Sequence, residues 1–427
     1  MTGFRIAVFT HGRRMLAMSV SLTVLAPAGL LPQPRAGAAA AAPVLASRRM
    51  ADGVEILEHG RDALLQAPQY AIAPTPLAVM GGAAGDPAFD LTHMWSAVLL
   101  SDGRVATWSG IGSKLLLFRA DGTAQRTIGR QGSGPGEFMN ATNLRSVAGD
   151  TLMLVDGANH RINWILPDRG VVAERSLKER FNRGFWTLAG VLPHGRIVVW
   201  NQSNAIGEPD RIVRSSAPIA TLSAGDGSFQ DIGSVPGQEL AMFETRFRGR
   251  PRVASLPLRL GLGANVVVWD TLIAAATSAR AQIDVRGADG RVVRQVSLPL
   301  LRRAVTNAMR SAVIDRELAR LRGPLSEGMI DPAESERLAR EAPFADSLPP
   351  FTDLFVSPDK TLWVVDAFAP GDTAWGAVGI RRDGAIVARV RGAGTAIPMA
   401  FGNDRVVLRR EDADGVVSLA VHRLVRR

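Results

Sequence analysis

The sequence has no cysteine, one tyrosine (Tyr70) and only three lysines among its 427 residues. The absence of cysteine excludes disulfide bonds, thiolate metal sites, a cysteine nucleophile and a lipid-anchored N-terminal cysteine. A chain of this length without such cross-links must draw its stability from the burial of a large apolar core. Its hydrophobic fraction of 46% is ordinary for a folded protein and excludes wholesale disorder.

Acidic residues are absent before Asp52, and three arginines occur within the first 14 residues. An apolar run follows over residues 15–31, and small residues fill positions 36–42. This order is typical of an export signal, so residues 1–42 are predicted to be cleaved and the mature protein to be periplasmic or extracellular. A retained anchor helix is the weaker interpretation because Pro32 ends the apolar run. The sequence leaves the export route, general secretory or twin-arginine, open.

Removal of residues 1–42 takes away four arginines and no acid, so the net charge falls from +10 to +6. A moderately basic protein favours anionic partners, but this charge does not indicate a nucleic-acid-binding protein. An exported protein also rarely meets nucleic acid. The partners expected are therefore proteins, peptides or anionic polymers of the cell envelope, with no stable transmembrane anchor after signal cleavage.

Recognisable catalytic motifs are absent as well. The sequence contains no G-x-S-x-G elbow, and its histidines at 59, 93, 160, 194 and 422 lack the H-x-H and H-E-x-x-H spacings of zinc sites. We therefore predict no catalytic residues and no cofactor. The sequence favours a binding protein, but it leaves an enzymatic activity open.

What the sequence does contain is a repeat of about 45 residues. Its clearest copy runs from Leu99 to Gly122 and reads as strand, tight turn, strand, loop, strand, Asp-Gly turn. The first turn returns at 149–150, 194–195, 270, 359–360 and 403–404, and the second at 168–170, 226–227, 289–290, 383–384 and 414–415. Six such units of four short strands predict an all-β, six-bladed β-propeller over residues 70–427, after a lead-in over 43–69.

The last unit has room for only three strands before the chain ends. We expect residues near 71–80 to supply its outer strand, because joining the two ends of the chain closes the ring and removes a free sheet edge. Six residues after each first turn, the second strands are expected to end on Ser109, Asp156, Asn201, Ala276, Asp366 and Arg410. The small polar side chains among these are expected to hydrogen-bond the backbone of the following loop.

One unit carries a recognisable motif. A glycine-rich loop reads Gly129-Arg-Gln-Gly-Ser-Gly-Pro-Gly-Glu-Phe138, and Asp156 and the corner Asn159-His-Arg-Ile162 follow. This segment resembles the NHL repeat of bacterial six-bladed propellers. The resemblance is specific over about 40 residues and fragmentary elsewhere. It implies a binding scaffold in most members and a lyase or hydrolase in a minority.

Long loops are expected to gather on one face of this propeller, because the tight turns joining strands one to two and three to four occupy the other. The long-loop face should collect the glycine-rich loop, segments 176–187 and 233–260, and an insertion over residues 301–346. The insertion is expected to be helical over 305–322, and a second helix should begin after Asp331 at Pro332.

Four arginines alternate along the expected face, at 246, 248, 250 and 252, and Arg130 lies in the glycine-rich loop. Such a run can grip carboxylate, phosphate or sulfate groups bidentately. It can equally be a solvated loop paired with Glu239, Glu244 and the acids of the insertion. We predict that Arg246, Arg248, Arg250, Arg252 and Arg130 bind an anionic peptide, polysaccharide or protein partner.

The alternative prediction is a calcium-dependent, lactonase-like hydrolase or lyase acting at the central channel. Its metal ligands would be Asp90, Asn143, Asn182 and Asp353, which lie near expected first strands. A hard cation held by such oxygen ligands can polarise a carbonyl group. Polar residues near strand starts are also common for structural reasons, so each of the four has a structural interpretation.

Overall fold

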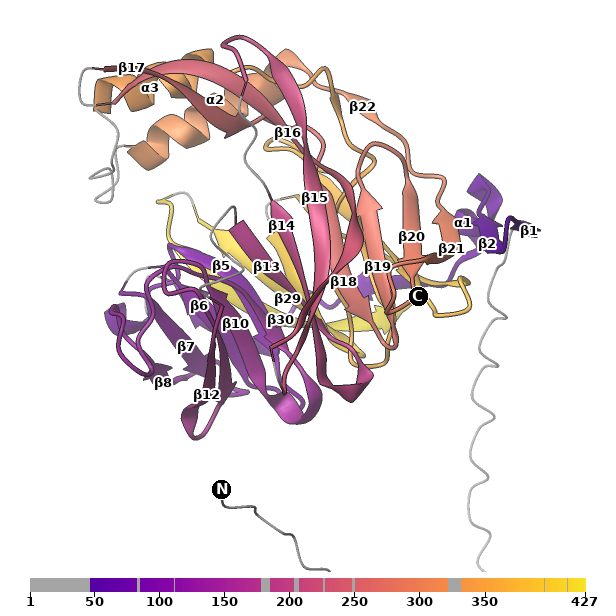
Figure 1. Ribbon diagram of the computed structural model, residues 1–427, viewed down its shortest axis with the longest axis horizontal. Helices are drawn as coiled ribbons and strands as arrows, with labels where there is room; N and C mark the ends of the chain where they lie inside the picture. Colours follow the sequence, from indigo (N-terminus) through magenta and orange to yellow (C-terminus); the bar gives the residue numbers. More distant parts are fainter. Residues whose placement is uncertain are drawn as a thin grey trace, which may run out of the picture. The chain divides into compact units, whose positions relative to one another are not determined.

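The computed structural model describes residues 47–427 apart from 83–84, 111, 178–184, 203–206, 226, 248–249, 322–331, 395 and 413. The predicted export signal, residues 1–42, lies outside this range. The described chain is mostly β, as predicted from the repeat, and its elements form successive antiparallel sheets (Figure 1). No helix in the described residues is long and apolar enough to span a membrane.

The first two sheets each consist of four strands in chain order. Sheet one contains β5 (Met94–Leu99), β6 (Val105–Ser109), β7 (Lys114–Phe118) and β8 (Ala124–Ile128). Sheet two contains β9 (Ala141–Ser146), β10 (Leu152–Asp156), β11 (Arg161–Leu166) and β12 (Gly170–Ser176). Every residue of β6 and β10 is buried, whereas β12 is largely exposed. The second strands β6 and β10 are thus covered on both faces by neighbouring sheets.

Sheets three and four follow the same plan with additions. Sheet three contains β13 (Phe185–Val191), β14 (Arg196–Gln202), β15 (Ile212–Ser223), β16 (Phe229–Phe247) and β17 (Arg250–Pro257). Sheet four contains β18 (Ala264–Trp269), β19 (Leu272–Thr277), β20 (Gln282–Arg286) and β21 (Val292–Ser297). The 19 residues of β16 extend past the sheet and return as β17 in a long hairpin.

Sheet five contains β24 (Phe351–Val356), β25 (Leu362–Asp366), β26 (Ala374–Ile380) and β27 (Ile386–Ala393). The last sheet contains β28 (Ala396–Phe401), β29 (Arg405–Glu411), β30 (Val417–Arg426) and β4 (Ala78–Gly81). The predicted outer strand of the last unit is therefore confirmed at residues 78–81, which pair with Ser418–Val421 of β30.

The turn at Asp414–Gly415 is one point on which the sequence interpretation was wrong. It was aligned with the turns that join third and fourth strands, but it joins β29 to β30, the second and third strands of its sheet. The turn therefore lies on the long-loop face. The physical reason is that the fourth strand of this sheet comes from the other end of the chain, so no turn after β30 is needed.

The lead-in, to which the sequence assigned no structure, also forms strands. The hairpin of β1 (Ser47–Ala51) and β2 (Val54–Glu58) adds to sheet four, with β2 parallel to β21. The short helix α1 (Arg61–Gln66) follows, and β3 (Gln69–Ile72) then pairs in parallel with β27 and antiparallel with β30. Residues 47–81 thus cover the outer edges of sheets four and five and complete the last sheet. We call them the N-terminal strap.

Two buried histidines hold the strap in place. His59 bonds the carbonyl of Gly384 at 2.8 Å, and His422 bonds the carbonyl of Ala73 at 2.7 Å. Burial lowers the pKa of both side chains and so favours their neutral forms. These two of the scattered histidines therefore have structural roles.

The first strands contact one another in the order β5, β9, β13, β18, β24 and β28, and β28 contacts β5 again. Polar side chains bond neighbouring first strands: Leu144 donates its N–H to Ser96, and Asn265 donates to the carbonyl of Thr352 at 2.6 Å. Between each pair of consecutive sheets lies a buried apolar cluster, including one between the last sheet and the first that contains Met80 and Leu116. The ring of first strands is therefore closed by packing at every junction.

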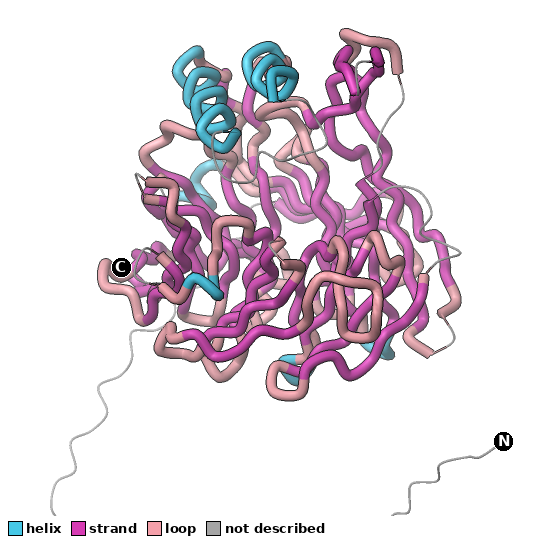
Figure 2. The backbone as a smooth tube through the Cα atoms, turned by 90° about the vertical axis from the view of Figure 1, so that its left-hand side faces the viewer, coloured by secondary structure: helices cyan, strands magenta, loops and turns pink. Residues whose placement is uncertain are grey.

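The insertion between sheets four and five is helical, as predicted. It contains α2 (Asn307–Leu321) and α3 (Pro332–Glu341), and the two-residue strands β22 (Arg303–Ala304) and β23 (Ser347–Leu348) pair at its base. The helix α3 begins at Pro332, as the sequence indicates. Figures 1 and 2 both show helices beyond the same end of the sheets, and Figure 1 places α2, α3 and β17 together there.

Candidate functional site

Strand connectivity places the large additions on one face. The tight turns join first to second and third to fourth strands, so the connections between sheets lie at the opposite end. The glycine-rich loop, the β16–β17 hairpin and the helical insertion all belong to that end. We call this end the long-loop face. It is the face on which the sequence predicted the binding residues.

The β16–β17 hairpin does not present its arginines as one stripe. The strands β16 and β17 are antiparallel, so Thr245 pairs with Arg252, and Arg246 with Pro251. Because side chains alternate across a strand, Arg246 lies on one face of the hairpin and Arg250 and Arg252 on the other. All three are exposed, and Arg248 lies outside the described residues. The expected single row is thus replaced by two basic faces at the hairpin end.

A carboxylate of α3 fastens the hairpin to the insertion. Glu334 accepts hydrogen bonds from the hydroxyl of Thr245 at 2.7 Å and from the backbone N–H of Arg246 at 3.3 Å, and it pairs with Arg337 at 2.6 Å. The guanidinium of Arg337 also lies 5.0 Å from the ring centre of Phe243. These hydrogen bonds, led by the one from Arg337, lower the pKa of Glu334 to about 2 and raise the pKa of Arg337.

A second arginine connects the base of the hairpin to both helices. Arg259 pairs with Glu317 of α2 at 2.7 Å and donates to the carbonyls of Leu338 and Ala339 in α3 at 2.7 and 2.9 Å. Its guanidinium lies over the ring of Phe344. Burial lowers the pKa of Arg259 and raises the pKa of Glu317. The hairpin and the insertion are therefore joined through two arginine centres into one surface.

Replacement of Glu334 by Gln should loosen this connection. The neutral amide keeps the size but loses the ion pair with Arg337, so backbone amides of residues 240–257 should exchange with deuterium several-fold faster. In the wild type the contact is present above pH 4.5 and is lost as the pH falls toward 2, since the pKa of Glu334 is depressed. Glu341→Gln is the matched control, because Glu341 pairs with the same arginine but is 57% exposed. Equal exchange in both variants would contradict the assignment.

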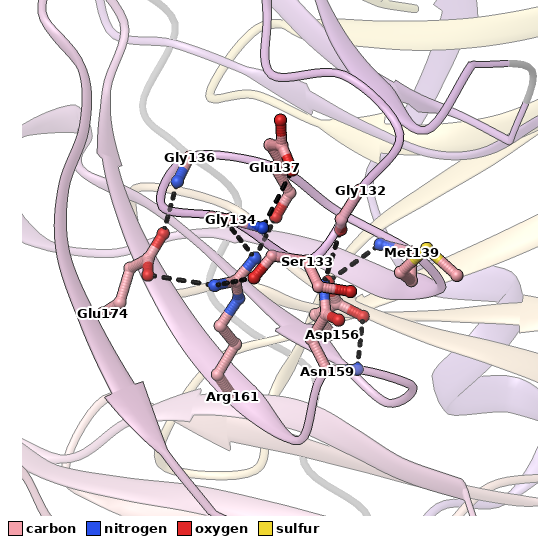
Figure 3. A network of polar contacts seen from close by, with 10 residues as sticks. All are labelled: Gly132, Ser133, Gly134, Gly136, Glu137, Met139, Asp156, Asn159, Arg161 and Glu174. Carbon is pink, nitrogen blue, oxygen red and sulfur yellow. Dashed lines mark hydrogen bonds and ion pairs between the residues drawn. The ribbon is translucent and has the colours of Figure 1, made fainter.

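The glycine-rich loop is held by a network of polar contacts, which Figure 3 shows from close by. Arg161 donates to the carbonyl of Gly134 at 2.9 Å and pairs with Glu174 at 3.1 Å. Glu174 in turn accepts the N–H of Gly136 at 2.7 Å. Gly129 has a positive φ of 81°, and a Cβ there would lie 2.2 Å from the ring of the fully buried Phe138. The motif residues therefore build the loop.

Asp156, at the end of β10, has the structural role that the register predicted. Its carboxylate accepts the backbone N–H groups of Met139, Asn140 and Asn159 and the side-chain amide of Asn159, at 2.8 to 3.2 Å. The exposed Arg130 pairs with Glu137 within the loop at 2.7 Å. The structure thus places Arg130 between sheets one and two, on a different connection from the hairpin arginines.

The residues predicted as calcium ligands have different surroundings. Asp90 accepts the N–H and hydroxyl of Thr92 at 2.8 and 2.7 Å at the surface. Asn143 is half-buried in an irregular part of β9 with a positive φ of 45°. Asn182 lies outside the described residues. Within the part of the chain that the structure describes, no three acidic or histidine side chains are close enough together to hold a metal ion.

Asp353 interacts electrostatically with Arg145, which the sequence analysis did not predict. It lies on β24, and Arg145 lies on β9, at the opposite position in the ring of first strands. The side chain of Asp353 reaches solvent, but the surrounding protein partly desolvates its carboxylate and so raises its pKa, and the charge of Arg145 opposes that rise. Arg145 itself donates to the carbonyl of Leu188 at 3.3 Å. The guanidinium of Arg145 would repel a cation bound at Asp353. The two residues are 208 positions apart in the sequence, so only the closure of the ring brings their strands into one structure.

The sheets succeed one another around a closed ring of first strands, which is an arrangement of the β-propeller type. No family model and no curated protein sequence matches the chain. The resemblance to NHL-repeat proteins therefore stays a prediction.

Among solved structures, the chain is similar to a putative exported protein from Bacteroides fragilis, with 10% identity over 84% of this chain and 99% of that one and a TM-score of 0.47. It is similar to an inactive variant of virginiamycin B lyase from Staphylococcus aureus, with 10% identity over 81% and 98% and a TM-score of 0.39. A calcium-binding regucalcin from Agrobacterium tumefaciens has 10% identity over 84% and 97% and a TM-score of 0.36.

Proposed function

We propose that this protein is an exported six-bladed β-propeller that binds an anionic partner of the cell envelope through its long-loop face. The number of blades is supported by the six apolar clusters, each of which lies between two consecutive sheets. Export is supported by the basic start, apolar run and small residues of positions 1–42.

The observation that carries the binding proposal is the fastening of the hairpin. Glu334 and Arg259 secure a hairpin that extends beyond the sheets, and exposed Arg246 and Arg250 lie at its end. Both side chains are exposed, and no acidic side chain among the described residues pairs with either of them. A fixed support reduces the entropy lost on binding, and the guanidinium geometry suits carboxylate, phosphate and sulfate groups.

The surroundings of the acidic calcium candidates favour a binding scaffold over a calcium-dependent enzyme. The acidic candidate nearest the ring, Asp353, has Arg145 as its electrostatic partner, and Asp90 is already used by Thr92. Calcium binding needs several oxygen ligands converging on one point. Asp90 and Asp353 each already interact with a neighbouring residue of the chain, and these interactions support binding as the proposed function.

Combined replacement of Arg246, Arg250 and Arg252 by Ser should weaken the binding of polyglutamate or dextran sulfate about 5- to 30-fold at low salt, because each exposed charge contributes up to about 1 kcal/mol. The affinity of the variant should also depend less steeply on salt, which screens exposed charges. Surface plasmon resonance from 50 to 500 mM salt measures both effects, and the melting temperature should stay within about 1 °C of the wild type.

Arg291→Ser is the matched control, since Arg291 is 89% exposed and lies beside a tight turn on the opposite face. It should leave affinity and salt dependence unchanged. A triple variant that loses stability but keeps its affinity would overturn the proposal. The arginines would then be structural, and binding would have to involve another surface.

A further inference from the structure

The six first strands of the described chain contain one basic and one acidic residue, Arg145 on β9 and Asp353 on β24. All the other residues of these strands are uncharged. In the order of the ring, β9 is the second first strand and β24 is the fifth, so the two strands lie opposite each other. Two charges of opposite sign thus lie on opposite sides of a ring that is otherwise neutral.

The two charges act on each other without direct contact. Among the described residues, each is the only charge that shifts the pKa of the other, and no hydrogen bond joins the guanidinium to the carboxylate. The Nε of Arg145 donates to the carbonyl of Leu188 at 3.3 Å, and this is the only hydrogen bond of that side chain to the described residues. The two terminal nitrogens of Arg145 are therefore left for another acceptor.

The protein around both groups replaces part of their hydration. Burial lowers the pKa of Arg145 and raises the pKa of Asp353, so the charged form of each is less well solvated than in water. The side chain of Asp353 nevertheless reaches solvent, so a solute can approach it. Attraction between opposite charges is stronger in such surroundings than in bulk water. A ligand that supplies the missing charge to each group gains from this difference.

The helical insertion connects opposite sides of the long-loop face. Arg316 of α2 pairs with Glu411 of the last sheet at 3.7 Å, and Glu334 of α3 accepts the hydroxyl of Thr245 in the hairpin of sheet three. The two helices also contact each other, and the first strands of sheets three and six hold opposite positions in the ring. This connection favours a small ligand over a polymer at the two charged residues of the first strands.

We propose that Arg145 and Asp353 form a binding site for a small zwitterion, a molecule with a carboxylate at one end and an ammonium group at the other. Arg145 binds the carboxylate through its terminal nitrogens, and Asp353 binds the ammonium group. Because the two side chains are not in contact, the ligand carries its charges on either side of a spacer. This site is separate from the exposed arginines of the hairpin and does not depend on the proposed function.

A series of ω-amino acids tests this proposal on the unmodified mature protein. Glycine, β-alanine, γ-aminobutyrate and ε-aminocaproate carry the same two charges at increasing separation. The longer members should bind at least about tenfold more tightly than the alkyl amine or the carboxylic acid of equal length, because each of these analogues lacks one of the two ion pairs. They should also bind more tightly than glycine, whose charges are too close together to meet both residues. Isothermal titration calorimetry measures these affinities.

Arg145→Gln and Asp353→Asn should each weaken the binding of the best member at least about tenfold, because each removes one ion pair. An amide in place of the guanidinium can still donate to the carbonyl of Leu188, and both variants should melt within a few degrees of the wild type. Asp90→Asn and Arg291→Gln are the matched controls, because they remove the same charges from exposed positions. Both should leave the affinity unchanged.

Three results would overturn the proposal. One is that no member of the series binds the wild type. Another is that the carboxylic acid binds as tightly as the ω-amino acid of equal length, since Asp353 would then take no part. The third is that the affinity is lost in the triple arginine variant of the hairpin and kept in Arg145→Gln and Asp353→Asn, which would assign the zwitterion to the long-loop face.

Discussion

Deletion of residues 43–81 is expected to abolish cooperative folding. The deletion removes the outer strand of the last sheet and two fully buried side chains, Leu57 and Met80, from two separate apolar clusters. Loss of a buried Leu or Met side chain costs about 2–5 kcal/mol each, and a domain is stable by only about 5–15 kcal/mol in all. The hydrogen bonds from His59 to Gly384 and from His422 to Ala73 are lost as well. Thermal unfolding followed by near-ultraviolet circular dichroism should show no transition.

Deletion of residues 43–52 is the control for this experiment. It removes β1, which is exposed along nearly its whole length, and leaves β2, β3 and β4 in place. Its melting temperature should stay within a few degrees of the wild type. If the longer deletion melted within a degree or two of the mature protein, residues 78–81 would not close the last sheet in solution.

Replacement of Asp366 by Asn is expected to stabilise the protein by about 2–3 kcal/mol at pH 7 and above. Burial raises the pKa of Asp366 from 3.8 to about 6, against the opposing charges of Arg389 and Arg303. One of its oxygens, Oδ1, is buried and has no hydrogen-bond partner among the described residues. The folded state thus carries a poorly solvated charge at neutral pH, and each pKa unit corresponds to about 1.4 kcal/mol.

The stabilisation should depend on pH in a defined direction. Because the pKa is raised on folding, Asp366 favours the folded state fully below pH 3.8, and this contribution is lost as the pH rises through about 6. The difference in unfolding free energy between Asp366→Asn and wild type should therefore be near zero at pH 3.5 and reach its plateau above pH 7. Urea unfolding at a series of pH values measures it. A constant difference across this range would show that the pKa of Asp366 is ordinary.

Asp156→Asn is the matched control, because Asp156 ends β10 as Asp366 ends β25. Its carboxylate accepts N–H groups of three residues, so the amide should destabilise the protein by about 1–3 kcal/mol. Comparing variant with wild type at each pH also cancels the effect of His59 and His422. The lowered pKa values of these histidines make the wild type less stable as the pH falls below 6.5.

These two aspartates show how far a repeat can predict local chemistry. The register correctly placed both at the ends of second strands, and it predicted a loop-bonding role for both. Asp156 accepts N–H groups of the loop beside it, whereas Asp366 is influenced by the charges of Arg389 and Arg303, and one of its oxygens has no partner among the described residues. The position follows from strand length, but the partners depend on the particular loop that packs there.

The same distinction applies to the proposed binding surface. Alternation of arginines over 246–252 suggested one row, but the antiparallel pairing of β16 with β17 puts Arg246 on one face and Arg250 and Arg252 on the other. Glu334 and Arg259, which join the hairpin to the insertion, carry no distinguishing pattern in the sequence. Their roles follow from contacts with residues about 60 to 90 positions away, and no local spacing encodes such contacts.

By itself, the sequence determined the all-β repeat, the second strands, nearly all of the tight turns, the closing strand near residue 80 and the helices of the insertion. These features depend on periodicity, turn residues and strand counts, which are local properties of the chain. Only the tertiary structure decided the strand additions of the lead-in and the electrostatic interaction of Arg145 with Asp353. Each of these depends on which strands become neighbours when the ring closes, and pairing between distant strands leaves no periodic signal in either of them.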